Sequence, residues 1–169
     1  MKKLFTLAFA LVMILSLAAC GGTSVSLVDV NTDQGISLKL PSDMTVQTNL
    51  SYANTKTSDI ATFASGDTDP ANFLTKLSQE DFVASELSDR TDLKIISFQN
   101  DKKISGNDSL VCKFSFTSAQ GTALTGAIII IDGASKEYII SLLYLSSNAN
   151  GSLAKNLDAC IDSIAVKAE

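Results

Sequence analysis

The sequence predicts an α+β fold in which an antiparallel β-sheet of about six to eight strands is covered by helices on both faces. Three observations in the 169 residues lead to this prediction. Short runs rich in β-branched and aromatic residues alternate with turn-forming residues, two of these runs are apolar on both sides, and a segment near the end has helical spacing of its apolar residues.

The first half of the predicted sheet consists of two pairs of strands. Residues 25–30 and 36–40 flank turn-forming residues at 31–35, which indicates a hairpin. Pro41 ends the second strand, because proline cannot donate a hydrogen bond in a ladder. Residues 45–52 and 59–65 are expected to form two further strands.

After these strands the spacing of the apolar residues changes to a helical one. Asp69 is placed to cap a helix that has Pro70 as its first residue. Ser78 and Asp81 give a second capping signal. We therefore expect one long or two short helices within residues 70–88.

Four successive strands follow, and the short turns between them imply antiparallel neighbours. They are expected at residues 93–100, 109–118, 123–131 and 136–145. Within residues 109–118, apolar side chains such as Cys112 alternate with polar ones such as Lys113, so one face of this strand is expected to contact water at least in part.

Residues 127–131 and 139–145 are apolar on both faces, so each side of the sheet must be covered there. A helix from Ser152 to Ile164, with its apolar residues in one stripe, supplies one cover. The helices within residues 70–88 supply the other.

The amino-terminal residues predict an export signal. Lys2 and Lys3 precede an uncharged apolar run, residues 4–19, whose sixteen residues fall short of the ~20 that span a bilayer. A cleaved signal peptide is therefore favoured over a retained membrane helix.

The sequence Leu17-Ala18-Ala19-Cys20 at the end of this run resembles the lipobox of bacterial lipoproteins. In that family the signal peptide is cleaved before the cysteine, the cysteine sulfur is diacylated, and two acyl chains suffice for stable anchoring. The resemblance implies a signal peptide at residues 1–19, a lipidated cysteine with a short tether at 20–24 and one globular domain at 25–169, held at the outer face of the cell membrane. An ordinary signal peptide that contains a cysteine is the alternative.

The charge of the mature chain restricts its partners. Removal of residues 1–19 leaves 18 acidic and 11 basic residues, a net charge of −7. Such a surface repels phosphate backbones and anionic lipid headgroups. We therefore expect no nucleic-acid partner, and attachment to the membrane through the lipid alone.

The composition argues against an enzyme. The chain has no histidine, which excludes Ser-His-Asp triads, Cys-His dyads and histidine metal ligands. Ser152 and Lys155 match the S-x-x-K spacing of β-lactamases, but the companion S-D-N and K-T-G motifs are missing. Residues 29–35 space their oxygens like a calcium loop, yet Gly35 and Leu40 stand at the wrong positions. We expect no catalytic residue, no cofactor and no metal site.

Cys112 and Cys160 remain after Cys20 is assigned to lipid. Both lie on predicted apolar faces, and we expect both to point into the layer where the closing helix meets the sheet. A disulfide is permitted outside the cytoplasm and would stabilise the domain by roughly 4 kcal/mol. Two buried thiols that act as small hydrophobes are the open alternative.

The order of elements resembles the PsbP/DcrB-like family, whose fold is an α-β-α sandwich around an antiparallel sheet. The matching pieces are GISLKLP at residues 35–41, and the strand at 136–145 followed by a helix through Ile164. Members are mostly extracytoplasmic or accessory binding proteins without a shared catalytic centre. The resemblance therefore implies a protein-binding accessory module and transfers no active-site residue. A carrier of a small apolar ligand, held between sheet and helix, is the alternative.

Overall fold

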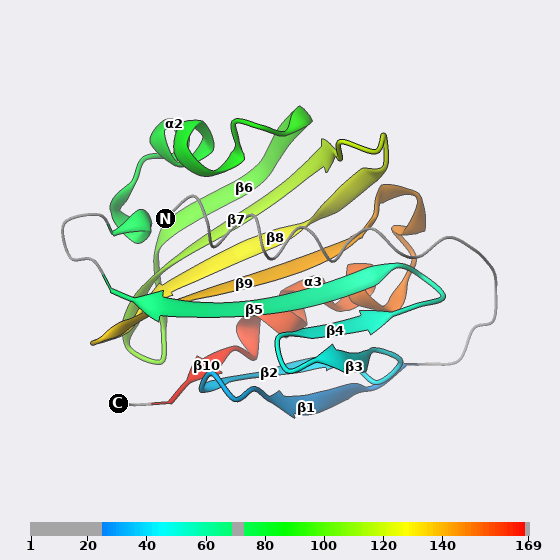
Figure 1. Ribbon diagram of the computed structural model, residues 1–169, viewed down its shortest axis with the longest axis horizontal. Helices are drawn as coiled ribbons and strands as arrows, with labels where there is room; N and C mark the ends of the chain where they lie inside the picture. The colour runs from blue at the N-terminus through cyan, green and yellow to red at the C-terminus, as the bar shows by residue number, and fades with distance from the viewer. Residues whose placement is uncertain (1–24, 69–72, 168–169) are drawn as a thin grey trace.

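The computed structural model describes residues 25–68 and 73–167, which form two antiparallel sheets and a few short helical segments (Figure 1). The strands are β1 (Leu27–Asn31), β2 (Ile36–Pro41), β3 (Thr45–Thr48), β4 (Ser51–Asn54), β5 (Asp59–Asp67), β6 (Thr91–Ile104), β7 (Asn107–Thr117), β8 (Ala123–Asp132), β9 (Lys136–Leu145) and β10 (Ala165–Val166). The helical segments are η3 (Leu74–Lys76), α2 (Gln79–Phe82), η4 (Val83–Leu87), η5 (Ser146–Asn148) and α3 (Ser152–Asp162).

The larger sheet has seven strands in the order β3-β4-β5-β9-β8-β7-β6. Strands β6 to β9 follow one another as hairpins, and β5 pairs with the free side of β9. Ser105 and Gly106 in the β6–β7 turn have φ values of 51° and 84°, the left-handed values that a two-residue type I′ turn requires. Most of this sheet is therefore built from local contacts.

The smaller sheet has three strands, with β2 between β1 and β10. Strand β10 is two residues long and pairs Ala165 with Ser37. The two ends of the described chain therefore meet in one sheet, beside the larger one (Figure 1).

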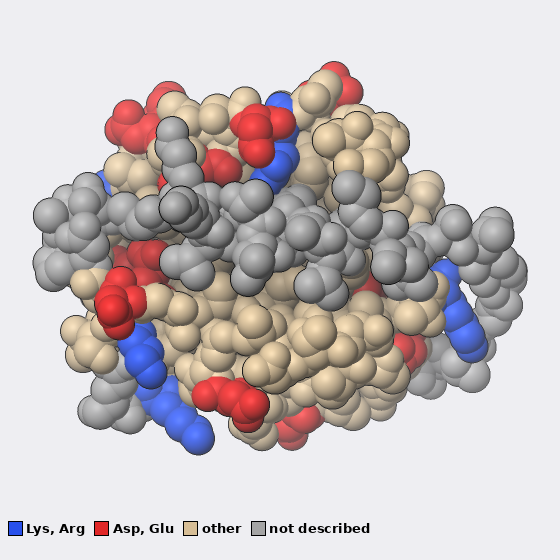
Figure 2. Space-filling model, viewed as in Figure 1, with Lys and Arg blue, Asp and Glu red and all other residues tan. Residues whose placement is uncertain are grey.

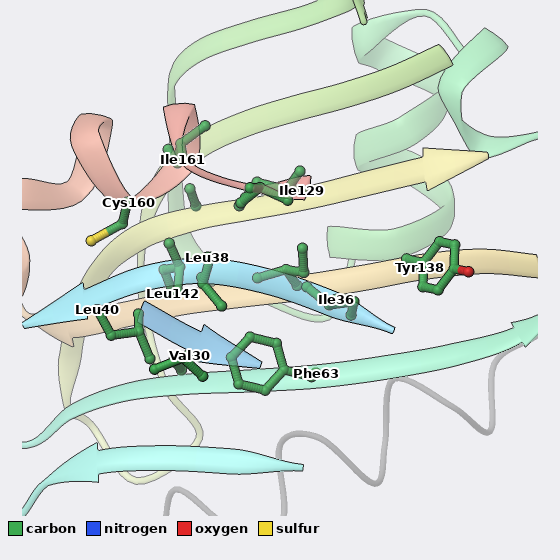
Figure 3. Packing of buried hydrophobic residues seen from close by; sticks show 14 of the residues in the cluster. Val30, Ile36, Leu38, Leu40, Phe63, Ile129, Tyr138, Leu142, Cys160 and Ile161 are labelled. Carbon is green, nitrogen blue, oxygen red and sulfur yellow. The ribbon is translucent and has the colours of Figure 1, made fainter. Parts of the chain in front are cut away.

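One face of the larger sheet packs against β2 and α3 (Figure 3). Ile129 of β8 and Leu142 of β9 are 0% exposed, and Leu38 of β2 and Ile161 of α3 are 2% and 3% exposed. Lys102 of β6 also forms an ion pair with Asp162 of α3 at 2.7 Å. The cover on this face is therefore a helix together with the small sheet.

The opposite face carries a second buried cluster, to which the helical segments η3, α2 and η4 contribute. Phe82 of α2 and Leu87 of η4 join Phe114, Ile128 and Ile130 of the sheet, and all five side chains are 0% exposed. Neighbouring residues of β8 thus alternate between the two clusters. The prediction that this strand is buried on both faces is confirmed.

The predicted architecture needs one correction. The strands divide between two sheets, and the segments packed on the second face have only three, four and five residues. The protein is mostly antiparallel β-structure with few helices, and a helical layer on each face is not confirmed. The alternating pattern of residues 36–40 indicates a strand with one buried face, but it does not indicate which sheet the strand joins.

Residues 45–52 are a hairpin and not the one predicted strand. The Leu50 N–H donates to Thr48 Oγ1 at 3.1 Å, and the hydroxyls of Thr48 and Ser51 lie 2.8 Å apart. These bonds close a tight turn between β3 and β4, because hydroxyl side chains compete with the ladder for backbone groups.

The predicted helical region divides into shorter segments. Ser78 caps α2 as expected, and its hydroxyl accepts a hydrogen bond from the Asp81 N–H at 3.2 Å. Asp69 and Pro70, the other predicted cap, lie outside the described residues.

Gly126 of β8 occupies a place where the backbone of β9 leaves no room for a side chain. A Cβ atom built there would lie 1.9 Å from the carbonyl oxygen of Leu142. Only glycine therefore fits at this point of the sheet.

We expect Gly126→Ala to reduce the free energy of unfolding by about 2–3 kcal/mol or to prevent folding, because the added methyl forces the two strands apart. The control is Ile128→Val, two residues along the same strand, which we expect to cost about 0.5–1.5 kcal/mol. Urea denaturation of the purified proteins measures both. Equal stability of Gly126→Ala and the unmodified protein would contradict the packing of β8 against β9.

Candidate functional site

Cys20, the predicted lipidation site, lies outside the described residues, as do the predicted signal peptide and the tether. Its acylation therefore stays a prediction. Within residues 25–68 and 73–167, no helix has both the length and the apolar composition needed to cross a membrane.

Cys112 and Cys160 are two free, buried thiols on opposite faces of the larger sheet. Cys112 belongs to the cluster with Phe82, whereas Cys160 belongs to the cluster with Ile129, where Figure 3 shows it on α3. The expectation that both point into one layer is wrong, and no disulfide joins them in the structure. The alternation along β7 was assigned correctly, but the alternation alone does not indicate which face receives α3.

Burial also determines the chemistry of these thiols. It raises the pKa of Cys112 and of Cys160 to about 11. Since the thiolate is the nucleophile, both groups stay protonated and unreactive near neutral pH. They act as small hydrophobic side chains.

Ser152 opens α3, and its side chain forms part of a polar cluster. Its hydroxyl hydrogen-bonds the carboxylate of Asp43, with distances of 3.0 and 2.9 Å to the two oxygens. Asn54 donates to the same carboxylate at 2.8 Å. The Lys155 side chain is exposed, and among the described residues it forms no hydrogen bond with the Ser152 hydroxyl. These contacts indicate a structural role. The Ser152 hydroxyl links the start of α3 to Asp43 in the turn between β2 and β3, and Asp43 in turn binds Asn54 at the end of β4.

Asp59 lies beside this cluster and is 0% exposed. The Leu153 N–H, in the first turn of α3, donates to Asp59 Oδ2 at 3.5 Å. Burial raises the pKa of Asp59 from 3.8 to about 6, and the charge of Asp43 adds to this rise. The positive end of the α3 dipole favours the ionised form of Asp59, but by less than burial away from water disfavours that form.

A second group of polar side chains lies on three neighbouring strands, β7, β8 and β9, next to the turn that joins β8 to β9. Asp108 of β7 pairs with Asp132 of β8, and Asp132 pairs with Glu137 of β9. Directly paired residues point to the same face of a sheet. We call Asp108, Asp132 and Glu137 the acidic row.

Only one end of the acidic row has cationic partners. Lys76 of η3 and Lys103 of β6 both form ion pairs with Asp108, and they lower the pKa of its carboxyl to about 2. Asp132 instead accepts a hydrogen bond from the hydroxyl of Thr75, which is 1% exposed. Within the described residues, no ion pair involves Asp132 or Glu137.

Burial away from water is therefore the main influence on the pKa values of the other two carboxyls, those of Asp132 and Glu137. Burial is the largest cause of the raised pKa of Asp132. Burial also raises the pKa of Glu137 from 4.5 to about 7, and the neighbouring charge and hydrogen bond of Asp132 add to this. One proton shared between two such carboxyls relieves their repulsion.

The described residues contain no group of three or more acidic or cysteine side chains arranged to hold a metal ion. The chemistry that the acidic row can perform is the gain and loss of a proton near neutral pH. Sequence reasoning missed this row. The sequence predicts a short turn between residues 131 and 136, but the register that places Asp132 opposite Glu137 comes only from the structure.

The edge of the larger sheet is the third feature with functional potential. All four residues of the edge strand β3 are exposed and uncharged, and Val46 is 61% exposed. The other edge, β6, carries Asp92, Lys94, Asp101, Lys102 and Lys103 and has three register shifts. Charges and bulges protect a sheet edge against pairing. Strand β3 has one register shift and no charge, so it is the less protected edge.

One face of the molecule also carries a broad area of described atoms without charged side chains. Figure 2 shows this area in the lower half of the view, where Figure 1 places β4 and β5, with acids and lysines around its margins.

No protein-family model and no curated protein matches the sequence. Among solved structures, the chain is similar to cyanobacterial PsbP (CyanoP) from Synechocystis sp. PCC 6803, with a TM-score of 0.60 and 12% identity over 89% of this chain and 99% of that chain. It is also similar to LpqN of Mycobacterium tuberculosis, described as involved in cell envelope biogenesis, with a TM-score of 0.54 and 15% identity over 86% and 92% of the two chains. The predicted PsbP-like fold is thus confirmed, and at such identities the similarity establishes the fold alone.

We expect the thiols of Cys112 and Cys160 to resist iodoacetamide in the native protein and to react fully after unfolding in urea without a reductant, since both are buried and free. Peptide mapping by mass spectrometry reports each site separately. Peptides that stay unlabelled after unfolding, and become labelled only after reduction, would contradict the structure.

We expect the stability of the protein to fall as the pH rises from about 4 to about 6. The folded protein, with the pKa of Asp59 near 6, holds a proton that the unfolded chain, with a value near 3.8, releases. Asp59→Asn removes this titration and should exceed the unmodified protein by about 1–2 kcal/mol at pH 7, while the two converge near pH 4. Urea denaturation across this range measures the effect, with Asp33→Asn, in the exposed β1–β2 turn, as the control. A loss of stability in Asp59→Asn at pH 7 would mean that the charge stabilises α3.

Proposed function

We propose that the protein is a lipid-anchored accessory module on the extracytoplasmic face of a bacterial membrane, without enzymatic activity, and that it binds a protein partner through the edge strand β3. The observation that carries the proposal is the uncharged, exposed edge of the larger sheet. An extended partner segment can add to such an edge through backbone hydrogen bonds.

Three further observations support this proposal. The lipobox at residues 17–20 implies an anchor outside the cytoplasm. The Ser152 hydroxyl is hydrogen-bonded to Asp43, and the thiols of Cys112 and Cys160 are buried, which supports structural roles for these three side chains. LpqN, one of the structural neighbours, is described as involved in cell envelope biogenesis, which suits the same location.

The side chain that we expect to matter most in the interface is Val46. It is the most exposed large apolar residue among the described ones, and it lies in the middle of β3. A lysine at this position introduces a charge into the edge, a device that natural sheets use to prevent pairing. Because the side chain lies outside both buried clusters, the fold should tolerate the change.

The test is chemical crosslinking in intact cells, followed by affinity purification of the full lipidated protein and quantitative mass spectrometry. We expect a partner that is recovered with the unmodified protein, is reduced about tenfold or more by Val46→Lys, corresponding to about 1.4 kcal/mol, and is lost with Cys20→Ala. Val28→Lys is the matched control, because Val28 is 41% exposed on β1 of the smaller sheet.

Equal recovery with Val46→Lys and Val28→Lys would exclude β3 as the interface. Full recovery with Cys20→Ala would show that the anchor is not needed for the complex. Recovery of no protein, together with an apolar small molecule that co-purifies in native mass spectrometry, would support the carrier hypothesis instead.

A further inference from the structure

The acidic row connects the larger sheet to the helical segment of residues 74–87. Thr75 of η3 donates its hydroxyl hydrogen to Asp132, and the neighbouring Lys76 pairs with Asp108. Farther along the same segment, Glu86 of η4 lies close enough to Glu137 for their charges to interact. The segment therefore contacts the row at its first end, through Thr75 and Lys76, and interacts with it by charge near its other end.

These contacts differ in how they depend on the charge of Glu137. Asp108 has two lysine partners of its own, so its ion pairs depend little on Glu137, while the charge of Lys76 also lowers the pKa of Asp132. Asp132 of β8 lies directly opposite Glu137, and the charge of Glu86 in η4 also raises the pKa of Glu137, by less than burial and Asp132 do. On the remaining side, β5 places the uncharged Gly66 opposite Glu137. An ionised Glu137 thus meets like charge on two sides.

We propose that the Asp132–Glu137 pair is a proton-operated latch, which holds residues 74–87 against the sheet when Glu137 is protonated and loosens them when Glu137 is ionised. In the protonated state the Glu137 carboxyl donates a hydrogen bond to Asp132, and Asp132 keeps the Thr75 hydroxyl. In the ionised state no proton joins the two carboxyls. Repulsion then separates Asp132 from Glu137 and pushes Glu86, with η4, away from the sheet.

The direction of the pH effect follows from the raised affinity of Glu137 for its proton. In the docked state the pKa of Glu137 is raised to about 7. When the segment loosens, Glu137 stays opposite Asp132 in the sheet, so its pKa falls toward the ordinary 4.5 only by the part of the burial that the segment supplies. Docking therefore weakens as the pH rises toward about 7, and it stays constant above that value. In an extracytoplasmic medium of changing acidity, the latch would therefore respond to pH changes between mildly acidic and neutral values.

The consequence lies in the cluster beneath the segment. Phe82 and Leu87 cover Phe114, Ile128 and Ile130 of the sheet. Loosening of residues 74–87 would give water or a ligand access to this apolar face. The proposal does not rest on the partner-binding role of β3, which lies at the far edge of the same sheet.

Amide hydrogen exchange of the full protein at pH 5.5 and pH 8, corrected for the intrinsic exchange rates, tests the latch. We expect the protection factors of residues 74–87 to fall about tenfold or more at the higher pH, since one unit of pKa difference corresponds to a factor of ten. In Glu137→Gln the amide donates to Asp132 at every pH, so protection should stay high and independent of pH. Glu80→Gln removes an exposed charge from α2 and should behave like the unmodified protein.

Two further readouts separate a latch from a general loss of stability. Protection within α3, on the other face of the sheet, should be the same in Glu137→Gln and in the unmodified protein. Carbon-detected NMR titration of the Glu137 carboxyl should show its midpoint well above 4.5. Protection of residues 74–87 that is equal at both pH values, or a Glu137 midpoint near 4.5, would overturn the proposal.

Discussion

The burial of β8 and β9 on both faces is the constraint on which the rest of the structure depends. Ile128, Ile129, Ile130 and Ile131 follow one another in β8, and all are 0% exposed. Each such side chain gains about 1.5–3 kcal/mol from leaving water, so neither face of this strand can stay open. The chain meets the requirement with two different covers, α3 with the three-stranded sheet on one face and short helical segments on the other.

This constraint also decides where polar chemistry can occur. The middle of the larger sheet is largely apolar on both sides, so its carboxyl groups are confined to strand ends and the edge strand β6. Asp59 lies at the start of α3, and Asp132 and Glu137 lie at the turn between β8 and β9. Each is partly or fully withdrawn from water without an ion-pair partner among the described residues, and burial raises the pKa of all three. The same sheet keeps Cys112 and Cys160 apart.

Local signals in the sequence predicted the parts of the fold that depend on local contacts. Strand β9 has the bounds 136–145 that were predicted, and the Ser78 cap is confirmed, because periodicity and capping involve neighbours in the chain. The pairing of Ala165 with Ser37 was not predictable, since a two-residue strand has no periodic signal and its partner is distant. The face of Cys112 was assigned correctly, but the element covering that face depends on tertiary packing.

The candidate sites show the same division. The cross-strand position of Asp132 and Glu137 follows from the register of one hairpin, and their separation from Lys76 and Lys103 follows only from the folded structure. The exposed edge of β3 depends on strand order, which single-sequence patterns do not specify. The predicted lipobox is different, since it is a linear motif whose recognition in the sequence does not depend on the fold.

Methyl and aromatic nuclear Overhauser contacts in the isotope-labelled protein test most directly whether the larger sheet separates two apolar layers. The account predicts contacts from the Ile129 methyls to Ile161 of α3, which Figure 3 shows beside it, and contacts from the Ile128 methyls to the aromatic rings of the other cluster, such as Phe82 or Phe114. Contacts from Ile128 to α3, or from Ile129 to Phe82, would place the two covers on one face and contradict the architecture.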